Sequence, residues 1–165
     1  MNANYWIKHL ELIPHPEGGY YKETYQSNII IGEEYLLDSH VGSRKSSSLI
    51  YYLLKGNEYS HFHRLKSDEL WIYQQGDSLK IHIINDEGEL TTKILGLNVE
   101  IGEVLQVLVP ANCWFAAELI NENTYILLSC MVTPGFVFKD FELANKGDMM
   151  NKYEEHSELI NRLTL

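Results

Sequence analysis

The chain has few cysteines and prolines and no long apolar run. Its 165 residues include two cysteines and four prolines. A disulfide framework is not expected, because Cys113 and Cys130 both lie in apolar segments where a small buried thiol is the usual interpretation. No apolar run approaches the roughly 18 to 20 residues of a membrane span, and residues 1–6 lack the features of a secretory signal. We therefore expect a cytoplasmic protein without a membrane partner.

Positive charge is also scarce. The chain has 13 Lys and Arg against 23 Asp and Glu, which gives a formal net charge of −10. An acidic surface repels the phosphates of nucleic acids and of anionic membranes, so neither is expected as a partner. Hydrophobic residues make up 45% of the chain, with eleven tyrosines and three tryptophans, as in a folded globular protein. The length fits one domain spanning residues 1–165.

Short apolar or alternating segments follow one another along the middle of the chain, separated by turn residues. Strands spaced about eight to twelve residues apart predict an all-β sandwich or barrel. No intervening stretch has the pattern of a crossover helix, so a parallel α/β sheet is disfavoured. The predicted strands are Tyr20–Gln26, Ser48–Lys55, Tyr59–Arg64, Asp68–Gln74, Leu79–Ile84, Leu90–Leu95, Val104–Val109, Cys113–Leu119 and Thr124–Val132.

The ends of the chain and two connecting segments have other patterns. Helical spacing predicts a short helix over Tyr5–Ile13, ended by Pro14, and a C-terminal helix over about Lys146–Leu163. Ile29–Ile31 and Tyr35–Leu37 are predicted to pair as a hairpin, and Phe136–Phe141 to form a last strand or extended segment.

The segment from Gly56 to Gly76 contains the strongest candidate site. Side chains alternate along a strand, so His61 and His63 are expected on the same side, roughly 6 to 7 Å apart. If the chain folds back at the corner before residue 68, Glu69 comes to lie beside the two histidines. Two imidazoles and a carboxylate would then converge in one cavity.

Such a group suits acid–base chemistry without a metal. Glu69 bonded to His63 would raise the basicity of the free imidazole nitrogen, with Tyr73 or Tyr52 as the opposing proton donor. This is the chemistry of sugar isomerases and epimerases. A satisfied internal hydrogen-bonded pair is the competing interpretation, and it stays open.

Aromatic and amide side chains complete the candidate site. Trp71, Trp114 and Phe115 offer stacking surfaces for a ring, although core packing is favoured for the two tryptophans. Gln106 lies in an apolar strand, where a buried amide needs partners and is expected to face the cavity. His15-Pro16-Glu17-Gly18-Gly19-Tyr20 specifies a rigid turn, for which turn formation and solvation are the favoured roles on the residues alone.

These motifs resemble the cupin superfamily. The resemblance is carried by Gly56, the His61-Phe62-His63 motif, Glu69, Gly76, Gly102 and Pro110. The runs at residues 15–21, 50–54, 60–71 and 133–141 resemble more closely its cupin_5 branch. This implies a double-stranded β-helix, or jelly-roll barrel, with a core over about residues 15–141 and short N-terminal and C-terminal helices. It also implies that His15, Glu17 and Tyr20 form a rim or lid of the barrel, and that the protein is a homodimer with twofold symmetry.

The sequence departs from the metal-binding cupins. Phe115 stands where their second motif supplies another histidine, so His61, His63 and Glu69 are the remaining ligands for a divalent transition metal. Two histidines and one carboxylate suffice for Fe(II), whereas structural zinc normally takes four protein ligands. A metal is therefore the less favoured alternative, and no cofactor is expected.

Three functions stay open at this stage. The first is a sugar or nucleotide-sugar isomerase or epimerase that uses His63 with Glu69. The second is non-catalytic binding of a small polar metabolite, and the third is a metal-dependent dioxygenase or isomerase. In each case the ligand is a small molecule. Positive charge from Arg44, Lys45, Arg64 and Lys66 near the cavity is compatible with a phosphate or carboxylate on it, but exposed, solvated charges are the favoured interpretation of these four residues. The residues expected to bind it are His15, Glu17, Tyr20, Tyr52, Ser60, His61, Trp71, Gln106, Trp114 and Phe115.

Overall fold

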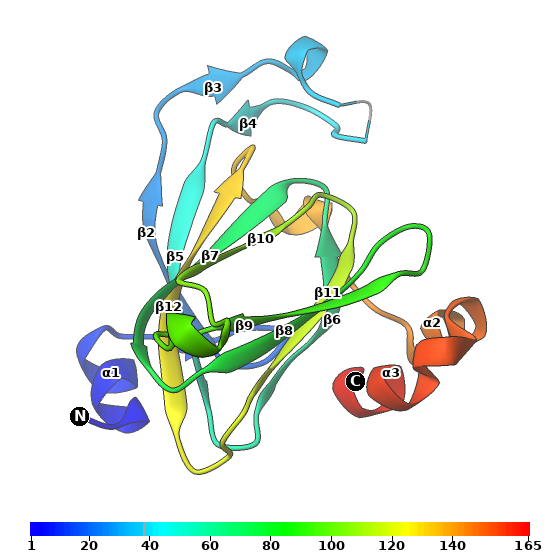
Figure 1. Ribbon diagram of the computed structural model, residues 1–165. Coiled ribbons are helices and arrows are strands. Elements are labelled where there is room, and N and C mark those ends of the chain that lie inside the picture. The colour runs from blue at the N-terminus through cyan, green and yellow to red at the C-terminus, as the bar shows by residue number, and fades with distance from the viewer. Residues whose placement is uncertain (38) are drawn as a thin grey trace.

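A computed structural model describes residues 1–37 and 39–165. Two antiparallel sheets face each other and close into a barrel (Figure 1). The first sheet has the order β1 (Ile13–Pro14), β2 (Tyr20–Gln26), β5 (Ser48–Lys55), β12 (Tyr125–Thr133), β7 (Asp68–Gly76) and β10 (Gln106–Val109). The second has the order β13 (Phe141–Leu143), β6 (Tyr59–Leu65), β11 (Trp114–Leu119), β8 (Leu79–Ile84) and β9 (Leu90–Leu95). The predicted all-β fold is confirmed.

The barrel interior is filled in part by a continuous apolar cluster. Trp71 and Phe115 are both almost fully buried in it, with ring centroids 6.1 Å apart in an edge-to-face arrangement. Tyr52 and Cys130 belong to the same cluster and also border the cavity described below. Inward-facing strand residues therefore supply both the core and one wall of the cavity.

Short helices cover the outside of the sheets (Figure 1). Helix α1 (Ala3–His9) lies against β5 and β12, and its N-terminus is capped by Asn2. At the other end, α2 (Lys146–Lys152), a 3₁₀ turn η4 (Glu154–His156) and α3 (Ser157–Leu163) pack on the outer face of β6 and β11. The single C-terminal helix that was predicted is broken, because Tyr153 leaves helical geometry and buries its ring among Phe62 and Trp114. None of the helices within residues 1–37 and 39–165 is long and apolar enough to cross a membrane.

Two connections differ from the prediction. Strand β3 (Ile30–Ile31) pairs with β4 (Arg44–Lys45), whereas Glu33–Tyr35 forms a 3₁₀ turn η1, so the predicted hairpin with Tyr35–Leu37 is wrong. β4 is held in place because Arg44 is fixed by a buried ion pair to Asp140. The predicted last strand is instead a 3₁₀ turn, η3 (Phe138–Asp140), followed by β13. Another 3₁₀ turn, η2 (Val99–Ile101), joins β9 to β10.

A β-bulge in β6 decides how the His-x-His segment is used. In the pairing with β11, His63 faces Phe115 and Ser60 faces Ala117, so three residue steps on β6 oppose two on β11. Because the extra residue interrupts the alternation, Ser60 and His63 both point inward, while Phe62 packs outward against the C-terminal helices. The prediction that His61 and His63 share a side is therefore wrong.

Candidate functional site

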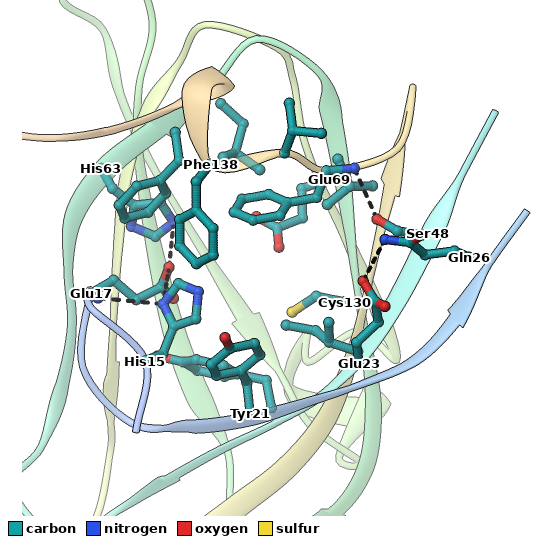
Figure 2. Close-up of a pocket in the computed structure, with 17 residues that line it drawn as sticks. His15, Glu17, Tyr21, Glu23, Gln26, Ser48, His63, Glu69, Cys130 and Phe138 are labelled. Atoms are coloured by element: carbon teal, nitrogen blue, oxygen red, sulfur yellow. Dashed lines mark hydrogen bonds and ion pairs between the residues drawn. The ribbon is translucent and has the colours of Figure 1, made fainter. Parts of the chain in front are cut away.

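The two sheets enclose a cavity of about 470 Å³ (Figure 2). Strands β2, β5, β6, β7 and β12 line it, together with the turn before β2 and the segment that leads into β13. The lining residues are His15, Glu17, Tyr21, Glu23, Gln26, Ser48, Ile50, Tyr52, His63, Leu65, Glu69, Cys130, Val132, Phe136, Val137, Phe138 and Phe141.

Glu17 is the centre of a buried polar cluster. Its Oε2 atom lies 3.2 Å from Nε2 of His63 and 3.2 Å from Nδ1 of His15, and Ser60 donates a hydrogen bond of 2.9 Å to Oε1. Burial by itself raises the pKa of Glu17, but the charge of His63 and the hydrogen bonds from His15 and Ser60 outweigh it and lower the pKa to about 2. The carboxylate partner of His63 is thus Glu17, and the predicted pairing with Glu69 is wrong.

The glycines that follow Glu17 allow the turn to enter the barrel. Gly18 has a φ of 109°, and a Cβ there would lie 2.1 Å from the carbonyl oxygen of Tyr59. The backbone N–H of His61 donates to the carbonyl of Glu17 at 2.8 Å, and the Tyr52 hydroxyl donates to that of Gly18 at 2.8 Å. Only glycine fits this close approach, and the contacts fix the carboxylate inside the cavity.

His63 is held at both ring nitrogens. Its Nδ1 lies 2.7 Å from the carbonyl oxygen of His61, which accepts the Nδ1 proton, and its Nε2 faces Glu17. Burial lowers the pKa of His63, while the charge of Glu17 and the carbonyl of His61 act in the opposite direction. Nε2 points at the carboxylate oxygen, so both nitrogens of His63 are engaged by groups of the described chain and neither is free to meet a ligand.

His15 has one free nitrogen. Its Nδ1 contacts Glu17, and its other nitrogen points into the cavity (Figure 2). The backbone N–H of Glu17 is also directed at Nδ1, at 3.3 Å, and can donate to it only in the tautomer that has the proton on Nε2. We assign the ring proton to Nδ1 because the negative charge of the carboxylate favours it there. This tautomer leaves the lone pair of Nε2 available to a ligand.

Glu69 points into the cavity from β7 (Figure 2). Its residue surface is 6% exposed, and Oε2 is buried with no hydrogen-bond partner in the described part of the chain. Burial raises its pKa to about 8, and the negative charge of Glu17 adds to the effect, although Trp71 and Cys130 oppose it. At neutral pH the side chain is therefore a carboxylic acid with an O–H group to donate.

The structure brings together only part of the predicted site. His15, Glu17, Tyr52, His63 and Glu69 border the cavity, and Ser60 touches it through Glu17. The other predicted site residues lie elsewhere: Tyr20, His61, Trp71, Tyr73, Gln106, Trp114 and Phe115.

Each of these lies elsewhere for a local reason. The bulge directs His61 away, to a separate pocket of about 330 Å³ that Tyr20 also lines. The Tyr73 hydroxyl donates to the carbonyl of Gly76 at 2.7 Å. Gln106 begins the edge strand β10 and is exposed, so the expectation that it faces the cavity is wrong.

The three aromatic residues are packing residues. Trp71 and Phe115 lie in the barrel core, as favoured for Trp71, and the ring of Phe115 is 4.0 Å from that of His63 between centroids. Trp114 faces outward against the C-terminal helices, with the guanidinium of Arg64 4.5 Å above its ring.

Sequence reasoning missed the aromatic wall of the cavity. Phe136, Phe138 and Phe141 come from the segment predicted as a strand, and the ring of Phe138 stacks with that of His15 at 6.3 Å between centroids. Asp140 anchors this segment by two hydrogen bonds from Arg44, of 2.6 and 2.7 Å. The alternation of β2 was a usable signal for Tyr21 and Glu23, since residues two apart on a strand share a face.

The side chains do not fit the metal centre that this fold can carry. His61 is turned away, Phe115 occupies the place of a further ligand, and the nitrogens of His15 and His63 are directed at the same carboxylate oxygen. Within residues 1–37 and 39–165, no three or more His, Cys, Asp or Glu side chains are grouped so that they could hold a metal ion. The groups available for chemistry in this cavity are therefore the side chains that line it.

Known proteins share both the sequence and the architecture. A solved structure of protein SO0799 from Shewanella oneidensis is 41% identical, covers 100% of this chain and 98% of its own, and superposes with a TM-score of 0.88. A hypothetical protein from Leishmania major is 36% identical over 99% of both chains, with a TM-score of 0.89. The uncharacterized protein YML079W of Saccharomyces cerevisiae is 32% identical over 143 residues, which is 81% of this chain and 71% of that protein.

More distant structures share the fold alone. A variant of oxalate decarboxylase from Bacillus subtilis superposes with a TM-score of 0.54 at 16% identity, over 91% of this chain and 36% of that one. The family model Cupin_5, described as cupin superfamily (DUF985), matches residues 4–144. The chain thus has a cupin fold and belongs to the Cupin_5 (DUF985) family of the cupin superfamily.

Proposed function

We propose that the cavity is the active site of an isomerase or epimerase that moves protons with its own side chains. One observation carries the proposal: a single cavity holds Glu17, bonded by two histidines and a serine, and Glu69, whose Oε2 atom is buried without a partner in the described part of the chain. These surroundings displace the two pKa values in opposite directions, to about 2 for Glu17 and about 8 for Glu69. Carboxyl groups set apart in this way are typical of a site in which one stays ionised and the other donates a proton.

The geometry gives each group a role. Nε2 of His15 takes a proton from the carbon beside a substrate carbonyl, and Glu17 stabilises the imidazolium that forms. The electron pair of the broken C–H bond moves to the carbonyl oxygen, which Glu69 stabilises with its O–H group. In an isomerisation of a hydroxycarbonyl compound, Glu69 gives its proton to this oxygen and takes the proton of the neighbouring hydroxyl group, while the imidazolium of His15 returns its proton to the former carbonyl carbon. In an epimerisation, a proton from solvent is added to the opposite face of the same carbon, and the imidazolium loses its proton to solvent.

His63 serves as a positioning residue in this scheme. It was expected to be the base, but both of its nitrogens are engaged by protein groups. Its contact with Glu17 compensates the negative charge of the carboxylate inside the cavity, where an uncompensated charge would be costly. The base role therefore passes to His15, the member of the cluster with a nitrogen that points into the cavity (Figure 2).

Proton exchange tests the proposal directly. Carbonyl compounds incubated with the protein in D2O are expected to gain deuterium beside the carbonyl, as followed by proton NMR. His15→Ala and Glu69→Leu, which remove the base and the donor, should each abolish the exchange, and Gln106→Ala should retain it because that side chain lies on the exposed edge strand. Exchange that persists in both cavity variants would refute the roles assigned here.

The second candidate is non-catalytic binding of a small metabolite. It is favoured by the same cavity, in which aromatic walls surround a few polar groups, as is usual in ligand pockets. A compound that binds and is recovered without deuterium from the same incubation would support it over catalysis.

A further inference from the structure

Histidines are the basic side chains in the cavity lining, and no lysine or arginine of the described residues stands there to meet an anion. Within the lining drawn from residues 1–37 and 39–165, three glutamates occur and no lysine or arginine. Three of the four basic residues considered for phosphate binding are used elsewhere: Arg44 binds Asp140, Arg64 binds Glu142, and Lys66 donates to the carbonyl of Ser39. The fourth, Lys45, is not among the lining residues. A phosphate group, with a charge near −1.5 to −2, would lie beside the ionised Glu17 with no lysine or arginine among the described lining residues as its counter-ion.

Glu69 specifies the opposite end of the ligand. The side chain of Glu69 points into the cavity (Figure 2), and its Oε2 atom is buried without a partner in the described part of the chain, which is destabilising for a polar group. As a carboxylic acid it offers a donor, so the group that satisfies it is an acceptor such as a carbonyl oxygen. An ammonium or amidinium group would instead require Glu69 to lose its proton.

The walls of the cavity suit a ring. Tyr21, Tyr52, Phe136, Phe138 and Phe141 line it. Its volume of about 470 Å³ lies in the lower half of the range of about 300–1,000 Å³ that is usual for small-molecule sites. Aromatic side chains stack on, or meet edge to face, the flat surface of a cyclic compound.

We infer from these three features that the ligand is an uncharged cyclic compound whose carbonyl oxygen faces Glu69, and that it carries no phosphate. This inference rests on the proposed function in one respect, the role of Glu69 as a donor. It favours unphosphorylated ring compounds over the nucleotide sugars that the sequence analysis considered as substrates. The charge of the cavity affects ligand binding whether or not turnover occurs.

Three probes of one shape test the inference. Benzamide, benzoate and benzamidinium share a phenyl ring and differ in the charge of the attached group. Ligand-observed NMR at pH 6, with the full chain and millimolar probe, is expected to show benzamide binding at least about tenfold more tightly than benzoate. Benzoate binding equal to or tighter than that of benzamide, or no benzamide binding at millimolar concentration, would overturn the inference.

The pH dependence identifies the group that the probe meets. Glu69 has a pKa of about 8 and must lose its proton before it can pair with benzamidinium. At pH 6 this requirement weakens benzamidinium binding about 100-fold relative to binding well above pH 8. Glu69→Gln keeps a donor and should retain benzamide binding while it removes this pH dependence. Glu69→Leu should weaken benzamide about tenfold. Gln106→Ala, on the exposed edge strand, should behave as the unaltered protein. Tightest binding of benzamidinium at pH 6 would assign a cationic ligand and overturn the inference.

The two proposals fail separately. Benzamide has no hydrogen on a carbon beside its carbonyl, so its binding reports the ligand class without turnover. Deuterium exchange into a phosphorylated sugar would refute the uncharged ligand and leave the proton-transfer function standing. The expected binding order with no exchange into any carbonyl compound would support the ligand class and refute catalysis.

Discussion

Replacement of Glu69 by glutamine should change how the stability of the protein depends on pH. The carboxyl group has a pKa of about 8 in the folded chain and an ordinary value of 4.5. The folded state therefore holds this proton more tightly than the unfolded state. Its contribution to stability is fully present below pH 4.5 and is lost as the pH rises towards 8. Each pKa unit corresponds to about 1.4 kcal/mol, so the complete loss is about 5 kcal/mol.

Glutamine cannot ionise, so the Glu69→Gln variant escapes this loss. Relative to the unaltered protein, its free energy of unfolding should rise by about 3 kcal/mol between pH 5 and pH 7.5. Urea unfolding followed by tryptophan fluorescence at both pH values measures the difference. Glu122→Gln, at an exposed turn position, is the control and should stay within about 0.5 kcal/mol at both. A Glu69→Gln effect that is the same at both pH values would mean that Glu69 is not a buried neutral acid.

Other substitutions test the cluster, the aromatic wall and the oligomeric state. Glu17→Gln should lower the free energy of unfolding in urea by about 3 kcal/mol or more, because His63 loses its buried partner. Ser60→Ala should lower it by about 1 kcal/mol, and equal losses in the two variants would contradict the central position of Glu17. Arg44→Ala should lower the free energy of unfolding by about 3–5 kcal/mol, because Asp140 is left buried without its partner. It should also weaken ligand binding, since the segment that carries Phe136, Phe138 and Phe141 is no longer anchored, and unchanged binding would show that this segment does not need the ion pair. A homodimer is expected by light scattering, and Ile30→Lys on the exposed β3 should make it monomeric; a monomer before substitution would refute it.

Local patterns in the sequence were enough to predict most of the barrel. Strands β2, β5, β8 and β9 begin and end at the predicted residues, because alternating apolar residues and turn signals are properties of the nearby chain. The pairing of β3 with β4 was not predictable in this way. It depends on Arg44 meeting Asp140, 96 residues later in the chain.

The candidate site was predicted only in part, because some of its features are local in the sequence and others depend on contacts between distant segments. The sequence motif drew attention to His63 and Glu69, and both border the cavity. The bulge that turns His61 away arises from pairing between β6 and β11, and strand alternation alone gives no sign of it. Glu17 reaches His63 only because a glycine turn enters the barrel, so the partner of the histidine could not be inferred from spacing along the chain.

The central claim is that one cavity holds an ionised Glu17 and a neutral Glu69. Carbon-13 NMR of the protein labelled at the glutamate carboxyl carbons measures both directly, with the signals assigned by Glu17→Gln and Glu69→Gln. The account predicts that the Glu69 signal titrates with a midpoint near 8 and that the Glu17 signal stays ionised down to a pH near 2. A Glu69 midpoint near its ordinary value of 4.5 would contradict the account, because both carboxyl groups would then be charged at neutral pH and no acid would face His15.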